Sequence, residues 1–407
     1  MDYMSVGDAA KNWKISERYV QRYCAEGRIE GAVKIGRSWA IPADARKPVN
    51  VRWAARKNDS QEGLRDEEEN SAQPRKLFTA MPLLNTPYQP GTAGDSIAAI
   101  EDADTRNIAL AEFYYFSGRS AEASDLAEEY LSHRDIAIRL SACWLYGYAN
   151  LALDRIPRAR QALAQVRSTL DSVDETTPEI YRAYALCIAT GACVLLHLPV
   201  SERLGSIREY LPLLPPGLRL FALYVQAHRT YLDGQYGTCI GIAETALALE
   251  GTLYPIPTIY LHLVATMGYI NLRQNEQAKA HLTEAWKIAR PDDMIEPFGE
   301  HHGLLGGMLE TTLKKDYPDD FKRIIDITYS FSAGWRKIHN PDTGHHVADD
   351  LSTTEFTVAM LAARGWSNKE ISAHLGISTN TVKMHISSVL QELNVPQRGD
   401  LAKYMLK

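Results

Sequence analysis

The sequence predicts a mainly α-helical protein, in which a solenoid of helical hairpins lies between two helix-turn-helix domains and the N-terminal domain carries a small β-hairpin wing. Helix-start signals crowd the C-terminal end, and turn residues recur through the middle. At the N-terminal end, an alternating apolar pattern follows two short helical patterns. The expected parts are a winged domain over 1–47, a partly disordered linker over 48–104, helical repeats over 105–335, a linker over 336–350 and a C-terminal domain over 351–407.

Three serines mark the starts of the helices expected at the C-terminal end. Ser352 with Glu355, and Ser367 with Glu370, form capping boxes, in which the serine and the glutamate three residues later each satisfy a backbone N–H group. After a glycine turn, Ser378 caps a third helix. The buried stripe of that helix is expected to be Val382, Ile386, Val389 and Leu393. Two short helices, a turn and a longer helix make a helix-turn-helix.

The opposite face of the third helix carries side chains suited to the major groove of DNA. They are Asn380, Lys383, Met384, Ser387 and Gln391. A lysine donates hydrogen bonds to guanine acceptors, and an apolar tip contacts a thymine methyl group. The pattern therefore favours double-stranded DNA as the partner. The alternative is a helical bundle without a DNA role.

The same stretch resembles the LuxR/GerE-type DNA-binding domain of bacterial transcription regulators, over about a seventh of the chain. The matching residues are Leu351, Glu355, Gly365, Ser367 to Ile371, Leu375, Ile377, Ser378, Thr381 to Lys383, His385, Leu393, Val395 and Arg398. The chain departs from the family pattern at Thr354 and at Gln391 and Glu392, where basic residues are common. These departures lower the positive charge that faces DNA.

The LuxR resemblance implies a set of contacts for the third helix and its neighbours. Base-reading side chains would be Lys383, Met384 and Ser387, beside Asn380. Phosphate contacts would come from Lys369, Thr381 and Arg398. A fourth helix often pairs two copies in this family, and its candidate contacts here are Leu401, Tyr404 and Met405. A homodimer is therefore expected.

Helix-start serines and an alternating pattern indicate a winged helix-turn-helix at the N-terminal end. Ser5 begins a first helix, and Ser16 begins a second helix that runs to Glu26. Alternating residues over 32–35 and 39–41 predict a β-hairpin. The segment resembles the excisionase/MerR-type DNA-binding domain through Ala10, Ile15, Ser16, Arg18, Val20, Arg22, Gly27 to Ile29, Val33, Gly36, Arg37, Ile41 and Pro42.

The excisionase/MerR resemblance covers about a ninth of the chain and implies a second DNA contact. Major-groove contacts would come from Ser16, Arg18, Tyr19 and Arg22. Arg37, at the tip of the wing, would reach a phosphate or the minor groove. The alternative is a winged domain that now serves protein contacts, because such folds are also used for other functions.

The middle of the chain repeats one kind of helix junction. Gly118, Asp154, Gly234 and Arg273 are each followed five residues later by a small residue, and they lie 36, 80 and 39 residues apart. The long interval has room for a weaker junction near 197–200. Helical hairpins with this period bury little surface alone and stack into a solenoid. The middle resembles tetratricopeptide-like arrays, including the sensor region of MalT-like LuxR regulators, which implies a small-molecule effector or a protein partner.

Charge and composition agree with two DNA-facing ends on an acidic body. The net charge of −6 divides into +3 over 1–50, +2 over 351–407 and −11 for the rest. The five cysteines have no metal-ligand or disulfide-framework spacing, which favours a reducing compartment. The longest apolar stretch, 183–196, is too short to cross a membrane, and the N-terminus lacks a signal-peptide pattern. We therefore expect a cytoplasmic protein that does not use a membrane.

The sequence carries no enzyme motif in a suitable context. The segment Gly31–Ser38 is similar to a phosphate-binding loop, but Arg37 stands where the loop needs lysine and a strand-like stretch follows. The paired histidines His301–His302 and His345–His346 lack metal-ligand spacing. We expect no catalytic residue, cofactor or metal site. The pattern favours a sequence-specific DNA-binding transcriptional regulator, and the alternative is a helical-repeat scaffold whose end domains serve protein contacts.

Overall fold

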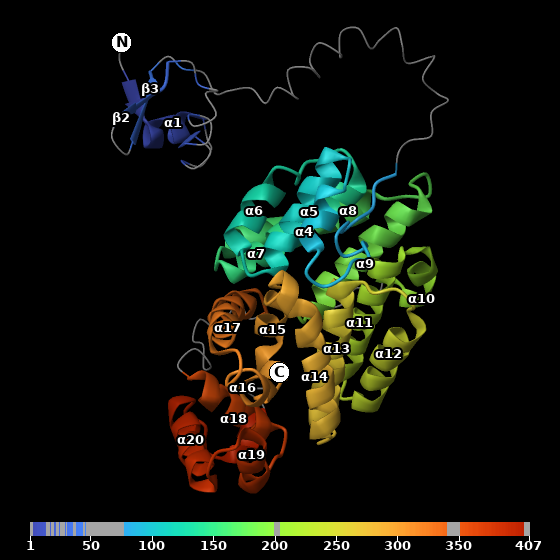
Figure 1. The fold of residues 1–407 in the computed structure, drawn as a ribbon, viewed down its shortest axis with the longest axis vertical. Helices are drawn as coiled ribbons and strands as arrows, with labels where there is room; N and C mark the ends of the chain where they lie inside the picture. Colours follow the sequence, from blue (N-terminus) through green and yellow to red (C-terminus); the bar gives the residue numbers. More distant parts are fainter. Residues whose placement is uncertain are drawn as a thin grey trace. The chain divides into compact units, whose positions relative to one another are not determined.

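The computed structural model describes parts of residues 3–45, and then residues 77–198, 204–339 and 351–402. The chain divides into two compact units, Met1–Leu77 and Phe78–Lys407, and each is described here by itself (Figure 1). Along these described stretches, no helix combines the length and the apolar character that a membrane crossing requires.

The first unit holds a three-stranded antiparallel sheet of order β1-β3-β2. Its elements are β1 (Tyr3–Ser5), α1 (Val6–Trp13), β2 (Val33–Ile35) and β3 (Ser38–Pro42). The strands β2 and β3 pair with Val33 opposite Ala40, which confirms the predicted hairpin. The strand β1, which places Tyr3 opposite Pro42, is an addition to the prediction. A strand of three residues directly before a helix offers too little alternation to be detected.

A small apolar core holds the sheet and α1 together. Ala9, Val20 and Ile41 are fully buried in it. The hydroxyl of Ser5 accepts the N–H of Asp8 at 3.1 Å, so α1 begins where the sequence predicts. The residues of this unit predicted to contact DNA lie outside the described residues: Ser16, Arg18, Tyr19, Arg22 and Arg37.

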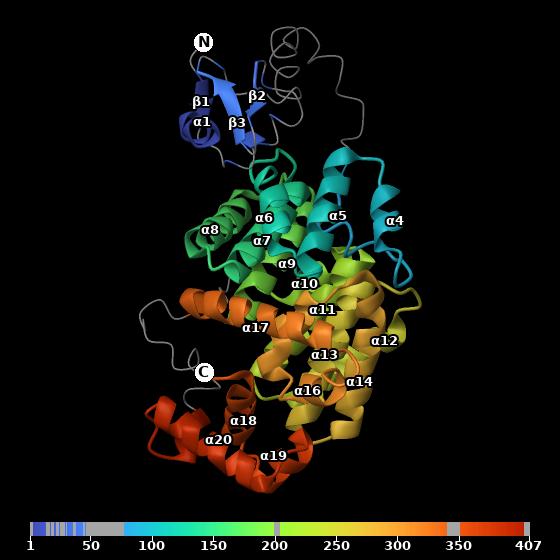
Figure 2. The same ribbon diagram turned by 60° about the vertical axis from the view of Figure 1, so that its left-hand side comes forward.

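The second unit consists mainly of helices that pack against their neighbours along the chain (Figure 2). The first of them are α4 (Ala93–Ala98), α5 (Ala103–Phe116), α6 (Ser120–Glu128), α7 (Ile136–Ala152), α8 (Ile156–Ser172), α9 (Glu179–Leu195), α10 (Ile207–Tyr210), α11 (Pro216–Leu232), α12 (Tyr236–Leu249), α13 (Pro255–Asn271) and α14 (Asn275–Ala289). We call residues 103–339 the helical middle.

Five junctions in the helical middle share one backbone geometry. Gly118, Asp154, His197, Gly234 and Arg273 all adopt a positive φ, between 51° and 74°. At each junction the next N–H group donates to the carbonyl five residues earlier, at 2.7–2.9 Å, which closes the preceding helix. The four predicted turn positions are confirmed, and the fifth lies in the predicted interval. The small residues five positions after the predicted turns are buried: Ala123, Ala159, Cys239 and Ala278.

The chain joins the second unit earlier than the sequence predicts. Ala80, Leu83 and Leu84 are buried, and the carboxyl group of Glu112 accepts the N–H groups of Leu83 at 3.0 Å and Leu84 at 2.9 Å. Burial raises the pKa of Glu112 to about 8. The predicted linker over 48–104 is therefore wrong for residues 78–104, whose prolines are typical of irregular chain, although the apolar island 77–84 of that linker could be expected to dock. Residues 48–76 lie outside the described residues.

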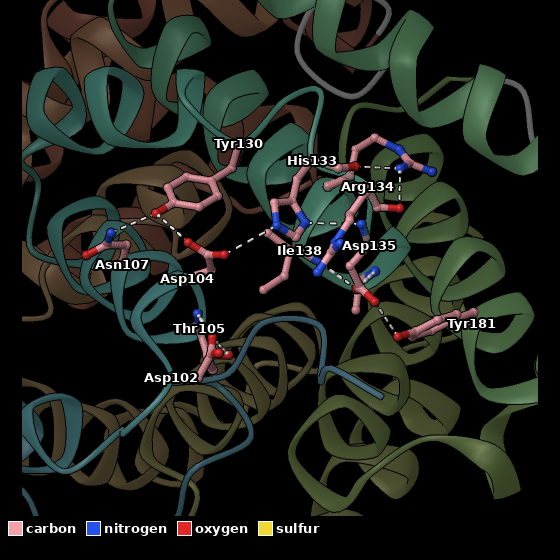
Figure 3. A network of polar contacts seen from close by, with 12 residues as sticks. Asp102, Asp104, Thr105, Asn107, Tyr130, His133, Arg134, Asp135, Ile138 and Tyr181 are labelled. Atoms are coloured by element: carbon pink, nitrogen blue, oxygen red, sulfur yellow. Dashed lines mark hydrogen bonds and ion pairs between the residues drawn. The ribbon is translucent and has the colours of Figure 1, made fainter. Parts of the chain in front are cut away.

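A network of polar contacts connects the first helices of the helical middle (Figure 3). The carboxylate of Asp135 caps α7 by accepting the N–H of Ala137 at 2.8 Å, and it also accepts the hydroxyl of Tyr181 from α9. The Nδ1 atom of His133 accepts the N–H of Asp135 at 3.1 Å, while its Nε2 atom lies 3.4 Å from Asp104 of α5. Helices α5, α7 and α9 therefore share one set of polar contacts.

The last helices of the helical middle fold back across the earlier ones (Figure 2). They are α15 (Glu296–His301), α16 (Met308–Thr312) and α17 (Pro318–His339). Helix α17 packs on α7 and α8, where the Nζ atom of Lys337 pairs with the carboxylate of Asp154 at 2.7 Å. Because α17 continues to His339, the predicted linker over 336–350 is wrong for its first residues. Residues 340–350 lie outside the described part.

Candidate nucleic-acid interface

The predicted helix starts of the C-terminal end are confirmed. Residues 351–402, which we call the head, contain α18 (Thr353–Ala363), α19 (Asn368–Leu375), α20 (Thr379–Glu392) and the 3-10 turn η5 (Arg398–Asp400). Ser352 with Glu355, and Ser367 with Glu370, form complete capping boxes. The hydroxyl of Ser378 caps α20. The hydrogen bond from Ser352 lowers the pKa of Glu355, so this cap holds the carboxylate in its charged form.

The inner face of α20 packs on α18 and α19. Its predicted stripe is buried: Val382, Ile386, Val389 and Leu393. Leu401, predicted as a contact between two copies, is fully buried in the core instead. That part of the prediction is wrong, because η5 turns the chain back onto the three helices. Tyr404 and Met405 lie outside the described residues.

The outer face of α20 is open to solvent. Asn380, Lys383, Met384 and Ser387 are exposed and stand at i, i+3, i+4 and i+7, so they share one face of the helix. Met384 is 62% exposed, so its thioether is open to solvent. We call these four residues the outer face. The structure thus brings together the predicted base-reading residues, and their contacts with DNA stay a prediction.

The three predicted phosphate-contacting residues differ in their surroundings. Lys369 is exposed near the start of α19. The hydroxyl of Thr381 lies 2.8 Å from that of Ser378. Arg398 donates to Asn368 and to the carbonyl oxygen of Trp366, and burial lowers its pKa. Arg398 therefore ties η5 to the start of α19, a structural role that the sequence does not reveal.

The head packs on the helical middle through α18 and α19. The Nη2 atom of Arg364 donates to the hydroxyl of Tyr231 at 2.7 Å, and the Nε2 atom of His374 lies 2.8 Å from the carbonyl oxygen of Gly306. Arg273 pairs with Glu370 at the edge of this contact. Burial is the main cause of the lowered pKa of His374. This interface leaves the outer face uncovered.

Sequence patterns give no signal for the interface between the head and the helical middle. Arg364 follows an apolar run and marks the end of a helix, and His374 occupies one position of a short helix. Their partners lie 133 and 68 residues away along the chain. Only the folded structure brings these groups together.

The geometry of the head defines a class of domain, and comparison with known proteins gives the same class. Residues 349–405 match the family model described as "Bacterial regulatory proteins, luxR family" (GerE). The head is therefore a luxR-type helix-turn-helix domain. No solved structure matches the chain.

Three curated relatives illustrate the extent of the similarity. The chain is 39% identical over 57 residues to the oxygen regulatory protein NreC of Staphylococcus carnosus, which is 14% of this chain and 26% of that protein. It is 48% identical over 50 residues to the nitrate/nitrite response regulator protein homolog of Haemophilus influenzae, covering 12% and 24%. It is 26% identical over 144 residues to the HTH-type transcriptional regulator MalT of Vibrio parahaemolyticus, covering 31% and 16%. The chain spans about a quarter or less of each.

The exposed lysine of α19 gives a prediction that separates backbone contacts from base contacts. We expect Lys369→Ala to weaken binding to all duplexes alike and to lower the slope of log affinity against log salt by about one, because one counterion fewer is released. Binding titrations on two unrelated duplexes at several salt concentrations measure both quantities. A loss confined to one duplex would contradict a phosphate contact at Lys369.

Proposed function

We propose that the protein is a sequence-specific DNA-binding transcriptional regulator, with the head as its main DNA-reading domain. The observation that carries this proposal is the outer face of α20, where a cation, two polar groups and an exposed thioether stand free on a capped and well-packed helix. Such a face matches the acceptors and methyl groups of the major groove. The luxR-type match over residues 349–405 supports the same function.

Selection from a random duplex library tests this function directly. Duplexes bound by the whole protein should converge on one motif, and the Lys383→Ala protein should lose that preference. A bound pool without any common motif would leave only non-specific binding and would contradict the proposal. A selected motif made of two half-sites would support the expected homodimer, which light scattering of the protein with and without DNA checks independently.

For the helical middle we propose a tetratricopeptide-like solenoid that senses a small-molecule effector or binds a protein partner. The five equivalent junctions support a repeat, since each closes a helix in the same way. The similarity to MalT over 144 residues supports the comparison with MalT-like regulators. Contacts from Arg364 and His374 to the helical middle give a physical route by which a change there reaches the head. We further propose that the protein acts in the cytoplasm and is not an enzyme.

For the N-terminal unit we propose a winged helix-turn-helix that touches a second DNA segment. Once one domain binds, the other searches a small volume, so the joint affinity exceeds that of either domain. We expect a footprint of two separate parts. The double variant Arg18→Ala with Arg22→Ala should erase one part, and Lys383→Ala the other. A footprint that stays whole in the double variant would assign the N-terminal unit to protein contacts.

The competing function is a helical-repeat scaffold in which the N-terminal unit, or both end domains, serve protein contacts. This alternative also rests on a stackable helical middle. The two functions differ in salt dependence and sequence preference, since a scaffold has no reason to discriminate between duplexes.

A further inference from the structure

Two buried glutamates lie on one face of the short helix α15. Glu296 and Glu300 are four residues apart, so their side chains are neighbours on the helix. Glu296 is 1% exposed, and the side chain of Glu300 is 9% exposed. Helix α15 contacts α5, α13 and α17, so both carboxyl groups lie inside the helical middle. A buried acidic pair is costly unless a cation or protons neutralise it.

Aromatic rings surround the two carboxyl groups. Tyr115 donates a hydrogen bond to one oxygen of Glu300, and Tyr260 donates to the other at 2.8 Å. The rings of Tyr224 and Tyr260 lie 4.9 Å apart, and those of Tyr115 and Tyr148 lie 6.3 Å apart. We call Glu296, Glu300 and these four tyrosines the acidic–aromatic cluster. Tyr115 and Tyr260 reach Glu300 with their hydroxyl groups, and a carboxylate beside aromatic rings is a setting that attracts an organic cation.

Several polar atoms at the cluster lack a hydrogen-bond partner. They are Oε1 of Glu296, the hydroxyl of Tyr148 and Nε2 of the adjacent His228. Most buried polar groups in proteins are paired, so the free Oε1 of the fully buried Glu296 indicates a missing polar partner. Among the residues described, neither glutamate has a lysine or arginine within ion-pair distance, and Nδ1 of His301 lies 4.0 Å from Glu300.

The groups around the cluster do not supply a positive charge near neutral pH. Burial raises the pKa of Glu296 and that of Glu300, the latter to about 7, while it lowers the pKa of His301 to about 4 and also that of His228. The other titratable groups that face the cluster are Tyr115, Tyr148, Tyr224, Tyr260, Cys193 and Cys239. None of these tyrosine and cysteine side chains becomes a cation on protonation. Only protons on the two glutamates therefore neutralise the acidic pair.

We propose that the acidic–aromatic cluster is the effector site of the helical middle and binds the ammonium group of a small organic amine. This inference rests on the proposed sensor function. An ammonium group donates to the free Oε1 of Glu296 and to the Glu300 carboxylate, and it lies against the tyrosine rings. The Glu300 proton leaves to solvent as the ammonium group enters, while Glu296 keeps its proton, so the net charge of the pair with its ligand stays zero. Entry requires α15 to shift, and with six residues it is a short helix.

The residues that directly follow helix α15 form part of the surface on which the head packs. After His301 the chain forms the turn η4 (His302–Leu304), and the carbonyl oxygens of Leu304 and Gly306 accept contacts from Arg364 and His374 of the head. Tyr231, three residues after His228 on α11, accepts the shortest hydrogen bond of Arg364, at 2.7 Å. A ligand that repositions α15 therefore alters the surface on which the head rests.

The test is a binding titration of the whole protein in amine-free phosphate buffer, with n-butylamine as the probe and 1-butanol as its neutral counterpart. We expect one saturable site per chain for the amine and none for the alcohol. Amine affinity should rise with pH through about 7, because the Glu300 carboxyl must lose its proton. The melting temperature should rise with amine concentration and not with alcohol. Absence of saturable amine binding, or equal binding of the alcohol, would overturn the inference.

Substitutions of the two glutamates test whether the amine binds at the acidic–aromatic cluster. Glu300→Gln should weaken amine affinity by at least about tenfold, because it removes the charged acceptor, and Glu296→Gln should weaken it less, because it alters a neutral acceptor. Glu276→Gln, an exposed carboxylate on α14, should leave amine affinity unchanged. Unchanged binding in both cluster variants would overturn the assignment. If a cluster variant fails to fold, the comparison of amine binding with alcohol binding on the unaltered protein still tests the proposal. DNA affinity measured on the same samples separates the two proposals, since intact DNA binding without amine binding refutes only this one.

Discussion

Replacing Lys383 by alanine should lower the affinity for the preferred duplex by about 1–3 kcal/mol, the value of one good base contact in the major groove. Lys383 is exposed at the centre of the outer face, and the inner side of α20 is fixed by Val382 and Ile386. The variant should therefore keep its fold and lose a contact. Fluorescence anisotropy titrations on the preferred and a scrambled duplex measure the loss.

The matched control for Lys383 is Lys279→Ala, which removes one exposed positive charge from α14 of the helical middle. It should change both titrations little, because a distant surface charge acts only through a screened field. An unchanged affinity and sequence preference in Lys383→Ala would contradict the assignment of α20 to the major groove. Equal losses of DNA affinity in the Lys383→Ala and Lys279→Ala proteins would show that Lys383 acts only through its charge.

Substituting Gly334 by alanine should destabilise the helical middle by about 1–3 kcal/mol or more, the usual cost of overpacking. A Cβ atom at Gly334 would lie 2.0 Å from the carbonyl oxygen of Leu151, and a backbone atom cannot turn aside as a flexible side chain can. The change should loosen α17 from α7 and lower the melting temperature, which calorimetry measures.

The matched control for Gly334 is Gly241→Ala in the interior of α12, where an added Cβ meets nothing within 4 Å. Alanine favours a helix over glycine by about 0.5–1 kcal/mol, so this variant should be slightly more stable than the unaltered protein. A Gly334→Ala protein that melts at or above the temperature of the unaltered chain would show that α17 does not pack on α7 as described.

Local signals predict much of this fold. The serine caps of the head depend on residues three positions apart, and the turns at Gly118 and Asp154 depend on a residue and its helix end. Both are short-range interactions that a sequence displays directly. The third helix of the head also carries its apolar stripe at a single period, so its inner and outer faces separate cleanly.

Long-range contacts account for what the sequence does not predict. The sequence marks 77–84 as an apolar island that could dock, but it does not reveal the partners, which include Glu112 and Ser141 far along the chain. The packing of the head on the helical middle depends on the hydrogen bond from Arg364 to Tyr231. The glutamates of α15 look like ordinary surface residues in the sequence, and only the crossing of α15 over earlier helices buries them. These features arise from packing, which periodicity does not encode.

The most direct test of the regulator function is the affinity of the whole protein for its selected duplex and for a scrambled duplex across a range of salt concentrations. We predict that the selected duplex binds roughly 10³-fold or more tightly, and that both affinities fall linearly in log–log form as phosphate contacts release counterions. Equal affinity for the two duplexes, or binding that does not depend on salt, would contradict the account.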